Sequence, residues 1–146
     1  MLFVQLFSRN KMDSLNKKVD GVLYRFTFLT PWLLRIGLGI SFFFHGYGKF
    51  PLPPQKLIDY FGFSEALASF VAIAELSAGI LLIIGGFMSN SLGNLITRFA
   101  ASLIVIIMIV ALGLAHRDWF ITPKLFMSEQ IFLLIIGLYF LIRGNK

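Results

Sequence analysis

The sequence predicts an all-α fold, a four-helix transmembrane bundle with short loops and an N-terminal cytoplasmic arm. Three observations predict it. Of 146 residues, 58% are hydrophobic and only 14% are charged, and the mean hydropathy is +0.84. A soluble domain carries about a quarter charged residues. In addition, four apolar segments approach the roughly 20 residues that cross a bilayer as a helix.

The first element is a basic arm, residues 1–27, which precedes a membrane domain over residues 28–146. Its start, "MLFVQLFSRNKMDSLNKKVDG", is apolar for too few residues to be a signal peptide and continues into charges, with no small-residue cleavage site. We therefore expect an interfacial or loosely ordered arm.

The four predicted spans follow in order, over residues 28–47, 66–87, 95–115 and 125–142. Pro31 suits the first turn of the first helix, whereas "PLPPQK" at 51–56 ends it because proline lacks the amide donor. The fourth span is slightly short. An even number of spans places both termini on one side. Lysine and arginine are denser at the arm, the second loop and the C-terminus, so this side is predicted to be cytoplasmic.

Two of the charged residues inside the predicted spans lie well away from the span ends. Glu75 is near the middle of the second span, at a depth where a carboxylate needs a partner and should face protein or water. Arg35 lies about 10 Å into the first span, at 1.5 Å per residue. We predict a buried ion pair between Arg35 and Glu75. Whether such a pair only orients the helices stays open, since removing either partner strands a charge.

A second polar group is predicted at the extracytoplasmic ends of the spans, as a candidate quinone or proton site. Gly37, Ser41, His45 and Lys49 recur every fourth residue and share a helix face. The predicted group consists of His45, Lys49, His116, Trp119 and Glu129. Imidazole and ammonium donate hydrogen bonds to a quinone headgroup, whereas Lys49 would oppose a metal cation, so no metal is predicted. Arg98 shares a face with His116 and is the charge at the cytoplasmic end of its span.

The absence of cysteine excludes disulfides, thiolate metal sites and cysteine nucleophiles. Redox chemistry would therefore need a bound cofactor, for which quinone is the candidate, or a partner protein. The net charge of +6 is attributed to residues flanking the membrane, not to nucleic-acid binding. The expected partners are the lipid bilayer and a protein subunit or a second copy of the chain.

The segments "HGYGKF", "AELSAGILLIIGGF" and "TRF", in this order, resemble the DoxX family over residues 31–144. The resemblance implies a four-helix protein of a bacterial-type inner membrane. Named members of this family include the small subunit of an archaeal thiosulfate:quinone oxidoreductase, and others belong to membrane oxidoreductase complexes that handle oxidative stress. The positions that match the family pattern are Arg35, His45, Gly46, Lys49, Glu75, Arg98 and, less closely, His116. The family assigns no catalytic residue.

Three functions are compatible with the sequence. The first is a membrane subunit of a quinone-linked oxidoreductase, with no independent catalysis assured. The second is a non-enzymatic scaffold or assembly factor whose arm docks a partner. The third is a small transporter or ion pathway, although four spans are few for a transporter and no inverted repeat is evident.

Overall fold

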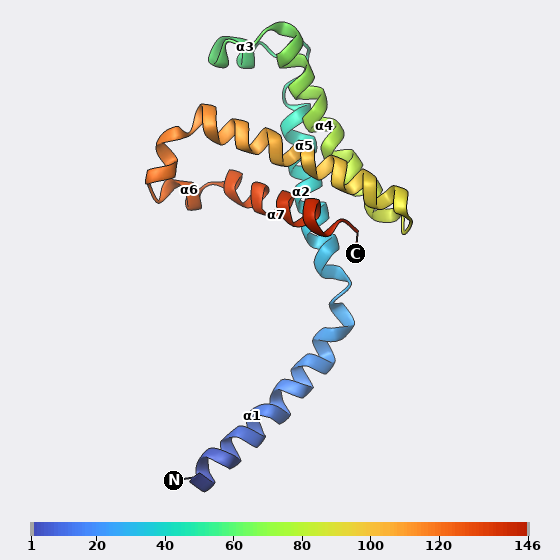
Figure 1. Ribbon diagram of the computed structural model, residues 1–146, viewed down its shortest axis with the longest axis vertical. Coiled ribbons are helices and arrows are strands. Elements are labelled where there is room, and N and C mark those ends of the chain that lie inside the picture. The colour runs from blue at the N-terminus through green and yellow to red at the C-terminus, as the bar shows by residue number, and fades with distance from the viewer. Residues whose placement is uncertain (1, 146) are drawn as a thin grey trace. The chain divides into compact units, whose positions relative to one another are not determined.

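The computed structural model describes residues 2–145, and the side chains of residues 11–120 and 122–145 (Figure 1). All regular structure in this part of the chain is helical, which confirms the all-α prediction. The longer helices are α1 (Leu2–Leu23), α2 (Leu29–Tyr47), α4 (Glu65–Phe87), α5 (Ser91–Ala115) and α7 (Glu129–Arg143). Short helices occupy the connections, namely η1 (Tyr24–Phe26), α3 (Gln55–Phe61), η2 (Arg117–Ile121) and α6 (Lys124–Met127).

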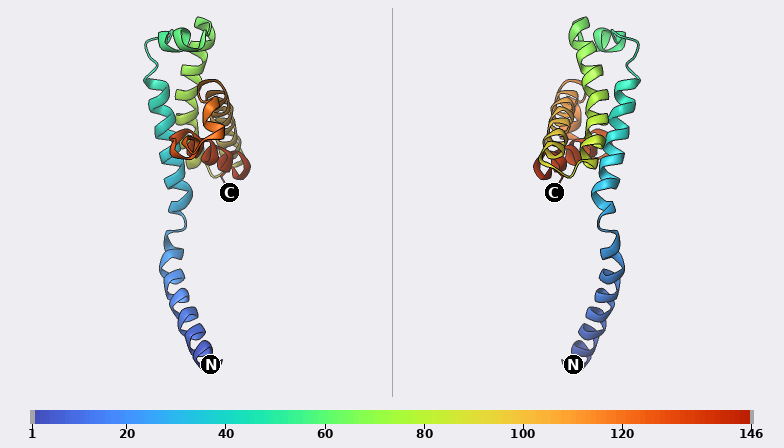
Figure 2. Two further views of the ribbon diagram at one scale, coloured as in Figure 1. Left: turned by 90° about the vertical axis from the view of Figure 1, so that its left-hand side faces the viewer. Right: turned by 90° about the vertical axis from the view of Figure 1, so that its right-hand side faces the viewer.

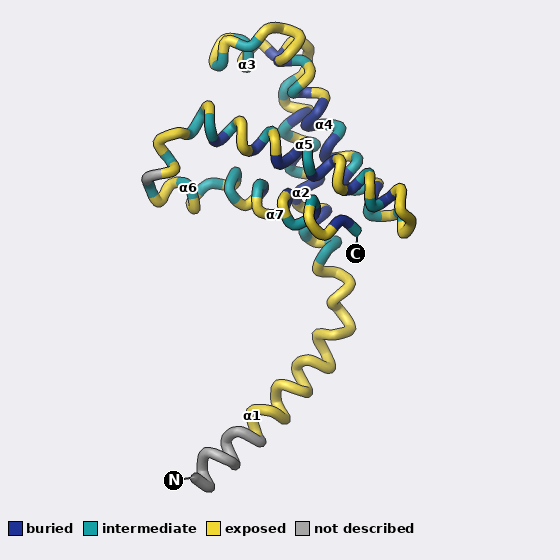
Figure 3. The backbone as a smooth tube through the Cα atoms, viewed as in Figure 1, coloured by how far each residue is buried: buried dark blue, intermediate teal, exposed yellow. Residues whose placement is uncertain are grey.

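The chain divides into two compact units, residues 1–33 and residues 34–146. In the first unit, α1 and η1 make the predicted arm a helix over most of its length. Every described side chain from residue 11 to residue 30 is exposed, as the yellow trace in Figure 3 shows. Because the described apolar side chains between residues 11 and 30 are all exposed, packing does not account for the helical form of that part of the arm.

In the second unit, α4 packs against α5 and α5 packs against α7. Figure 1 and both views of Figure 2 show α5 and α7 side by side, running across α2 and α4 and not parallel to them. The side chains that fill the space between these layers are fully buried, and they include Leu38, Phe42, Leu82, Ile104 and Phe140. Large apolar side chains cover the outside as well, which suits lipid as the surrounding solvent.

Helices α2 and α4 approach each other until their backbones touch. A Cβ added to Gly79 would lie 2.5 Å from the carbonyl oxygen of Gly39, and one added to Gly46 would overlap the backbone of Leu76. Small residues permit this approach between membrane helices. It fixes which residues of the two helices face each other, and therefore which polar side chains can meet.

The helix ends follow local chemistry. Ser64 caps α4 by accepting a hydrogen bond from the Leu67 amide (3.3 Å), and Asn90 caps α5 by accepting one from the Gly93 amide (2.9 Å). Gly62 ends α3 in the left-handed conformation, with φ of 67°. These caps give α4 and α5 sharp starts close to the predicted ones.

The predicted helix over residues 125–142 is wrong in one respect, because the structure breaks it at Ser128 into α6 and α7. The backbone of Ser128 is extended, and its hydroxyl donates to the carbonyl oxygen of Leu125 at 2.7 Å. Serine competes with helical hydrogen bonding in this way. The remaining α7 has 15 residues and rises about 22 Å, less than the ~30 Å of a bilayer core.

Within residues 2–145, two helices, α4 and α5, are long and apolar enough to cross a membrane, and a third crossing results if residues 11–26 and α2 count as one broken span. The structure thus confirms an all-α fold with helices that could cross a membrane, and it does not confirm the predicted bundle of four spans.

Candidate functional site

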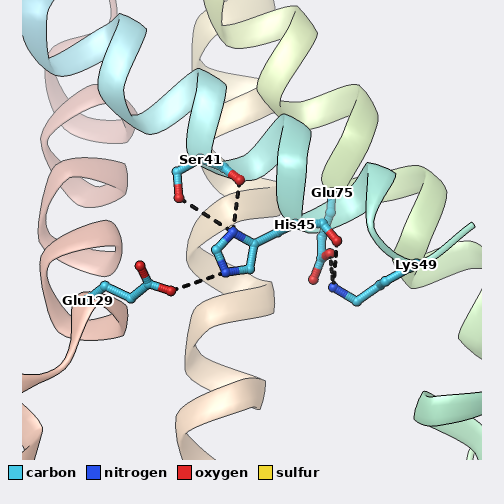
Figure 4. A network of polar contacts seen from close by, with 5 residues as sticks. All are labelled: Ser41, His45, Lys49, Glu75 and Glu129. Atoms are coloured by element: carbon cyan, nitrogen blue, oxygen red, sulfur yellow. Dashed lines mark hydrogen bonds and ion pairs between the residues drawn. The ribbon is translucent and has the colours of Figure 1, made fainter.

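Polar side chains of α2, α4 and α7 form a connected group near the C-terminal end of α2 (Figure 4). His45 lies in the last turn of α2. Its Nδ1 lies 2.8 Å from the carbonyl oxygen of Ser41, one turn earlier, and its Nε2 lies 3.3 Å from Oε1 of Glu129 at the start of α7. The His45 side chain is 39% exposed and that of Glu129 is 61% exposed.

This geometry constrains which nitrogen of His45 acts as the hydrogen-bond donor to Ser41. A carbonyl oxygen only accepts hydrogen bonds, so Nδ1 of His45 is the N–H group of this contact and donates a hydrogen bond to the carbonyl oxygen of Ser41. Nε2 of His45 and Oε1 of Glu129 can therefore form a hydrogen bond only if one of these two atoms also carries a hydrogen. The geometry thus places His45 and Glu129 for a hydrogen bond at a partly exposed position.

Lys49 lies just beyond α2 and joins this group to the interior of the unit. Its ammonium donates to the carbonyl oxygen of His45 at 3.1 Å and to Oε2 of Glu75. The Glu75 side chain is only 7% exposed and that of Lys49 is 20% exposed. The burial predicted for Glu75 is correct, and its partner is the lysine one turn after His45.

The predicted Arg35–Glu75 ion pair is therefore wrong. Arg35 is buried, as predicted, but its Nη1 donates to the carbonyl oxygen of Leu82 (2.5 Å) and to Oγ1 of Thr97 (3.0 Å). Its Nη2 donates to Oδ1 of Asn145 at 2.8 Å. The guanidinium also lies over the ring of Phe140, 4.6 Å from its centroid. The cause of the error is the helix register, because contacts at the small residues of α2 and α4 place Arg35 beside the C-terminal part of α4.

Asn145, which follows α7, forms hydrogen bonds with residues of α2, α4 and α5, and this role was not predicted from the sequence. Its amide nitrogen Nδ2 donates to the carbonyl oxygens of Gly85 (2.7 Å) and Met88 (3.1 Å), while its Oδ1 accepts from Thr97 (2.5 Å) as well as from Arg35. Its backbone amide donates to Asn94 at 3.0 Å. A single polar residue after the last apolar segment gives no sequence signal for such a role. Thr97, within "TRF", could have been suspected as a hydroxyl facing a predicted buried arginine.

The remaining predicted residues lie elsewhere. His116 stacks on Trp119, with ring centroids 3.6 Å apart and planes at 17°. Among the described side chains, no hydrogen bond or ion pair joins this stack to His45 or Glu129. Arg98 is exposed and donates to the carbonyl oxygen of Ile142 at 3.0 Å, at the end of the unit that holds Arg35. The structure thus joins His45, Lys49 and Glu129 and adds Glu75 to them.

No group of three or more histidine, cysteine, aspartate or glutamate side chains in the described chain is arranged to hold a metal ion. A surface depression lies on α3, lined by Lys56, Leu57, Asp59, Tyr60 and Phe61. None of these residues belongs to the His45 group.

Comparison with known proteins gives one family. The DoxX family model matches residues 30–117, more than half of the chain, and this range holds Arg35, His45, Lys49, Glu75 and Thr97. No curated protein and no solved structure matches the chain. The family match and the apolar helices together indicate a multi-pass membrane protein. The chain belongs to the DoxX family.

Proposed function

We propose that the chain is an integral membrane subunit of a quinone-linked oxidoreductase system, in which the His45–Glu129 pair binds a quinone headgroup and exchanges a proton with it. One observation carries the proposal, the contact of 3.3 Å between Nε2 of His45 and Oε1 of Glu129 at a partly exposed position, while Nδ1 of the same ring lies against the carbonyl oxygen of Ser41. The proposal includes four spans, over the membrane domain 28–146, with both termini in the cytoplasm of a bacterial-type cell.

The donor set of the pair fits a quinone. A quinone supplies a two-electron acceptor whose carbonyl oxygens accept hydrogen bonds and protons. In the protonated pair, Nε2 of His45 is a donor on a partly exposed ring. Reduction of the quinone to the quinol consumes two protons, so His45 would donate one proton at a time, and Glu129, which is the more exposed of the two, would replace each with a proton from water. The electrons would come from a partner subunit.

Lys49 has a positioning role in this proposal. Its ammonium already donates to Glu75 and to the backbone oxygen of His45, so it holds the last turn of α2 and does not bind the headgroup. The His116–Trp119 stack belonged to the wider site that the sequence predicts, and its participation is tested separately below.

The test measures quinone bound to the purified full-length protein. Lipid extracts of the protein in nanodiscs are analysed by mass spectrometry, and a short-chain quinone is titrated into protein freed of lipid quinone. His45→Gln and Glu129→Gln should each weaken binding about tenfold or more, because a hydrogen bond to a charged group contributes ~1.5–3 kcal/mol. Asp59→Asn, which changes an exposed carboxylate on α3, is the matched control and should bind as the parent does.

Two results would reject the proposal: a parent protein that binds no quinone, or variants of His45 and Glu129 that fold and bind with unchanged affinity. His116→Ala decides the extent of the site. Loss of affinity in that variant would include the stack at the end of α5, and unchanged affinity would restrict the site to the His45–Glu129 pair.

A further inference from the structure

The arm carries an exposed apolar stripe. Met12, Leu15, Val19 and Val22 follow one another at intervals of three, four and three residues, and therefore lie on one face of α1. Their side chains are between 49% and 66% exposed, and Leu23 widens the stripe at 57%. Within the first unit, no described residue covers these side chains, and they lie outside the segment that matches the family.

One edge of this stripe is basic. Lys11 and Lys18 are seven residues apart and each directly precedes a stripe residue. At 3.6 residues per turn, both lie roughly 70–90° from the middle of the stripe. Asp13 and Asp20 lie further round, roughly 110–130° from the middle, and Lys17 is almost opposite it. Arg25, in η1, continues the basic sequence directly before Phe26.

This pattern argues against a membrane span. Residues 11–26 are apolar enough to cross a membrane only when they are counted with α2 as one broken span. Between residues 11 and 25 they carry six charged side chains, namely Lys11, Asp13, Lys17, Lys18, Asp20 and Arg25. A helix that crosses the bilayer would place them in hydrocarbon, where each is costly. A helix lying in the surface would bury only the stripe and leave the charges in water.

The pattern also argues against pairing with a second copy of the helix. The stripe has coiled-coil spacing over only about two heptads, fewer than a stable coiled coil sustains. In such a pair, Lys11 and Lys18 would lie at equivalent heptad positions beside the helix–helix contact. The residues of the second helix that face them would be Asn16 and Leu23. No carboxylate would compensate the two ammonium groups. Anionic phosphate groups in a lipid surface would do so, while lysine side chains extend from the edge of an embedded stripe.

We propose that residues 11–26 form an amphipathic helix that lies in the plane of an anionic membrane surface, with Met12, Leu15, Val19 and Val22 embedded and Lys11 and Lys18 bound to lipid phosphates. The proposal does not depend on quinone binding. It assigns the arm to lipid headgroups and not to a protein partner.

The test uses the full-length protein in liposomes, where the absence of native cysteine allows a single reporter. Leu15→Cys places an environment-sensitive fluorophore on the stripe, and Lys17→Cys places it on the opposite face as the matched control. Quenching by brominated lipid is measured in phosphatidylcholine alone and in mixtures with phosphatidylglycerol. The reporter at residue 15 should be quenched, more strongly with the anionic lipid, whereas the reporter at residue 17 should stay in water.

A charge variant then measures the lipid selectivity. Lys11→Gln with Lys18→Gln, in the Leu15→Cys background, should lower the ratio of embedded to free arm about 30-fold in anionic liposomes, at about fivefold per charge. Asp13→Asn with Asp20→Asn is the matched pair and should not lower it.

Three outcomes would overturn the proposal. Equal quenching at residues 15 and 17 would mean that the helix crosses the bilayer. Quenching that ignores phosphatidylglycerol would remove the role of the lysines. No quenching, together with efficient disulfide cross-linking of Leu15→Cys between copies, would assign the stripe to a second chain.

Discussion

Glu75 and Lys49 allow the most direct test of the arrangement inside the second unit. The structure pairs Glu75 with Lys49, whereas the sequence alone favours Arg35 as its partner. Two double-mutant cycles separate these alternatives. One combines Lys49→Met with Glu75→Gln, and the other combines Arg35→Met with Glu75→Gln.

The expected energies follow from burial. Removing one partner of a buried ion pair costs about 3–5 kcal/mol, because the other charge is left unpaired. The Lys49 side chain is 20% exposed, so we expect a value near the lower limit, about 3 kcal/mol, for Lys49→Met. Glu75→Gln should cost about 2 kcal/mol, because the amide oxygen still accepts from Lys49. The double variant should cost about 3 kcal/mol, which gives a coupling of about 2 kcal/mol.

The assay is equilibrium unfolding of the purified protein in mixed micelles, in which the fraction of denaturing detergent is raised and helix content is followed by circular dichroism. Arg35→Met should itself be strongly destabilising because it removes two buried hydrogen bonds and one partly buried hydrogen bond. Its effect should nevertheless add to that of Glu75→Gln within about 0.5 kcal/mol, since the two residues share no partner.

The opposite pattern would refute the reasoning. If Arg35 and Glu75 couple by about 2 kcal/mol while Lys49 and Glu75 are additive, the register of α2 on α4 described above is incorrect. If neither cycle shows coupling, water reaches the Glu75 side chain from the membrane surface, and the burial described for that side chain is incorrect.

Three further predictions use the same unfolding assay. Gly46→Ala should destabilise by about 1–3 kcal/mol, because its Cβ would overlap the backbone of α4. The control Gly37→Ala, whose Cβ would meet open space, should be neutral or stabilising by up to ~1 kcal/mol. Equal effects of the two substitutions would contradict the close approach of α2 and α4. Asn145→Ala should cost about 2–3 kcal/mol through its lost hydrogen bonds to Arg35 and the backbone of α4, and a cost below ~0.5 kcal/mol would deny it a structural role. The cycle of His45→Gln and Glu129→Gln should give only about 0–1 kcal/mol of coupling, because both side chains are exposed; a larger value would mean that the pair is buried, for example by a partner.

The helices themselves could largely be predicted from the sequence. The apolar segments 66–87 and 95–115 correspond to α4 and α5 because Ser64 and Asn90 cap them. The break at Ser128 could not be predicted, since it depends on one hydroxyl that competes with the backbone inside an apolar run.

The pairing of charges was harder to predict because it depends on the register of two antiparallel helices. Arg35 and Glu75 each need a partner, but the contact between Gly39 and Gly79 aligns Arg35 with Leu82 and Gly86. The same alignment brings Gly46 to Leu76, and with it Lys49 to Glu75. Matching the glycines of the two helices before pairing their charges would have given the observed partners. Asn145 offered no comparable pattern.

The two cations Arg35 and Lys49, of which Arg35 is buried and Lys49 is partly buried, differ in their response to an electric field. Lys49 forms a neutral pair with Glu75, so a voltage across the bilayer acts on little more than a dipole there. The partners of Arg35 in the described chain are a carbonyl, a hydroxyl, an amide and an aromatic ring, which leave its full unit charge uncompensated. Moving such a charge through the whole field corresponds to ~2.3 kcal/mol per 100 mV. The contact between Arg35 and Asn145 should therefore become stronger or weaker with the sign of the membrane potential, whereas the Lys49–Glu75 pair should not respond to it.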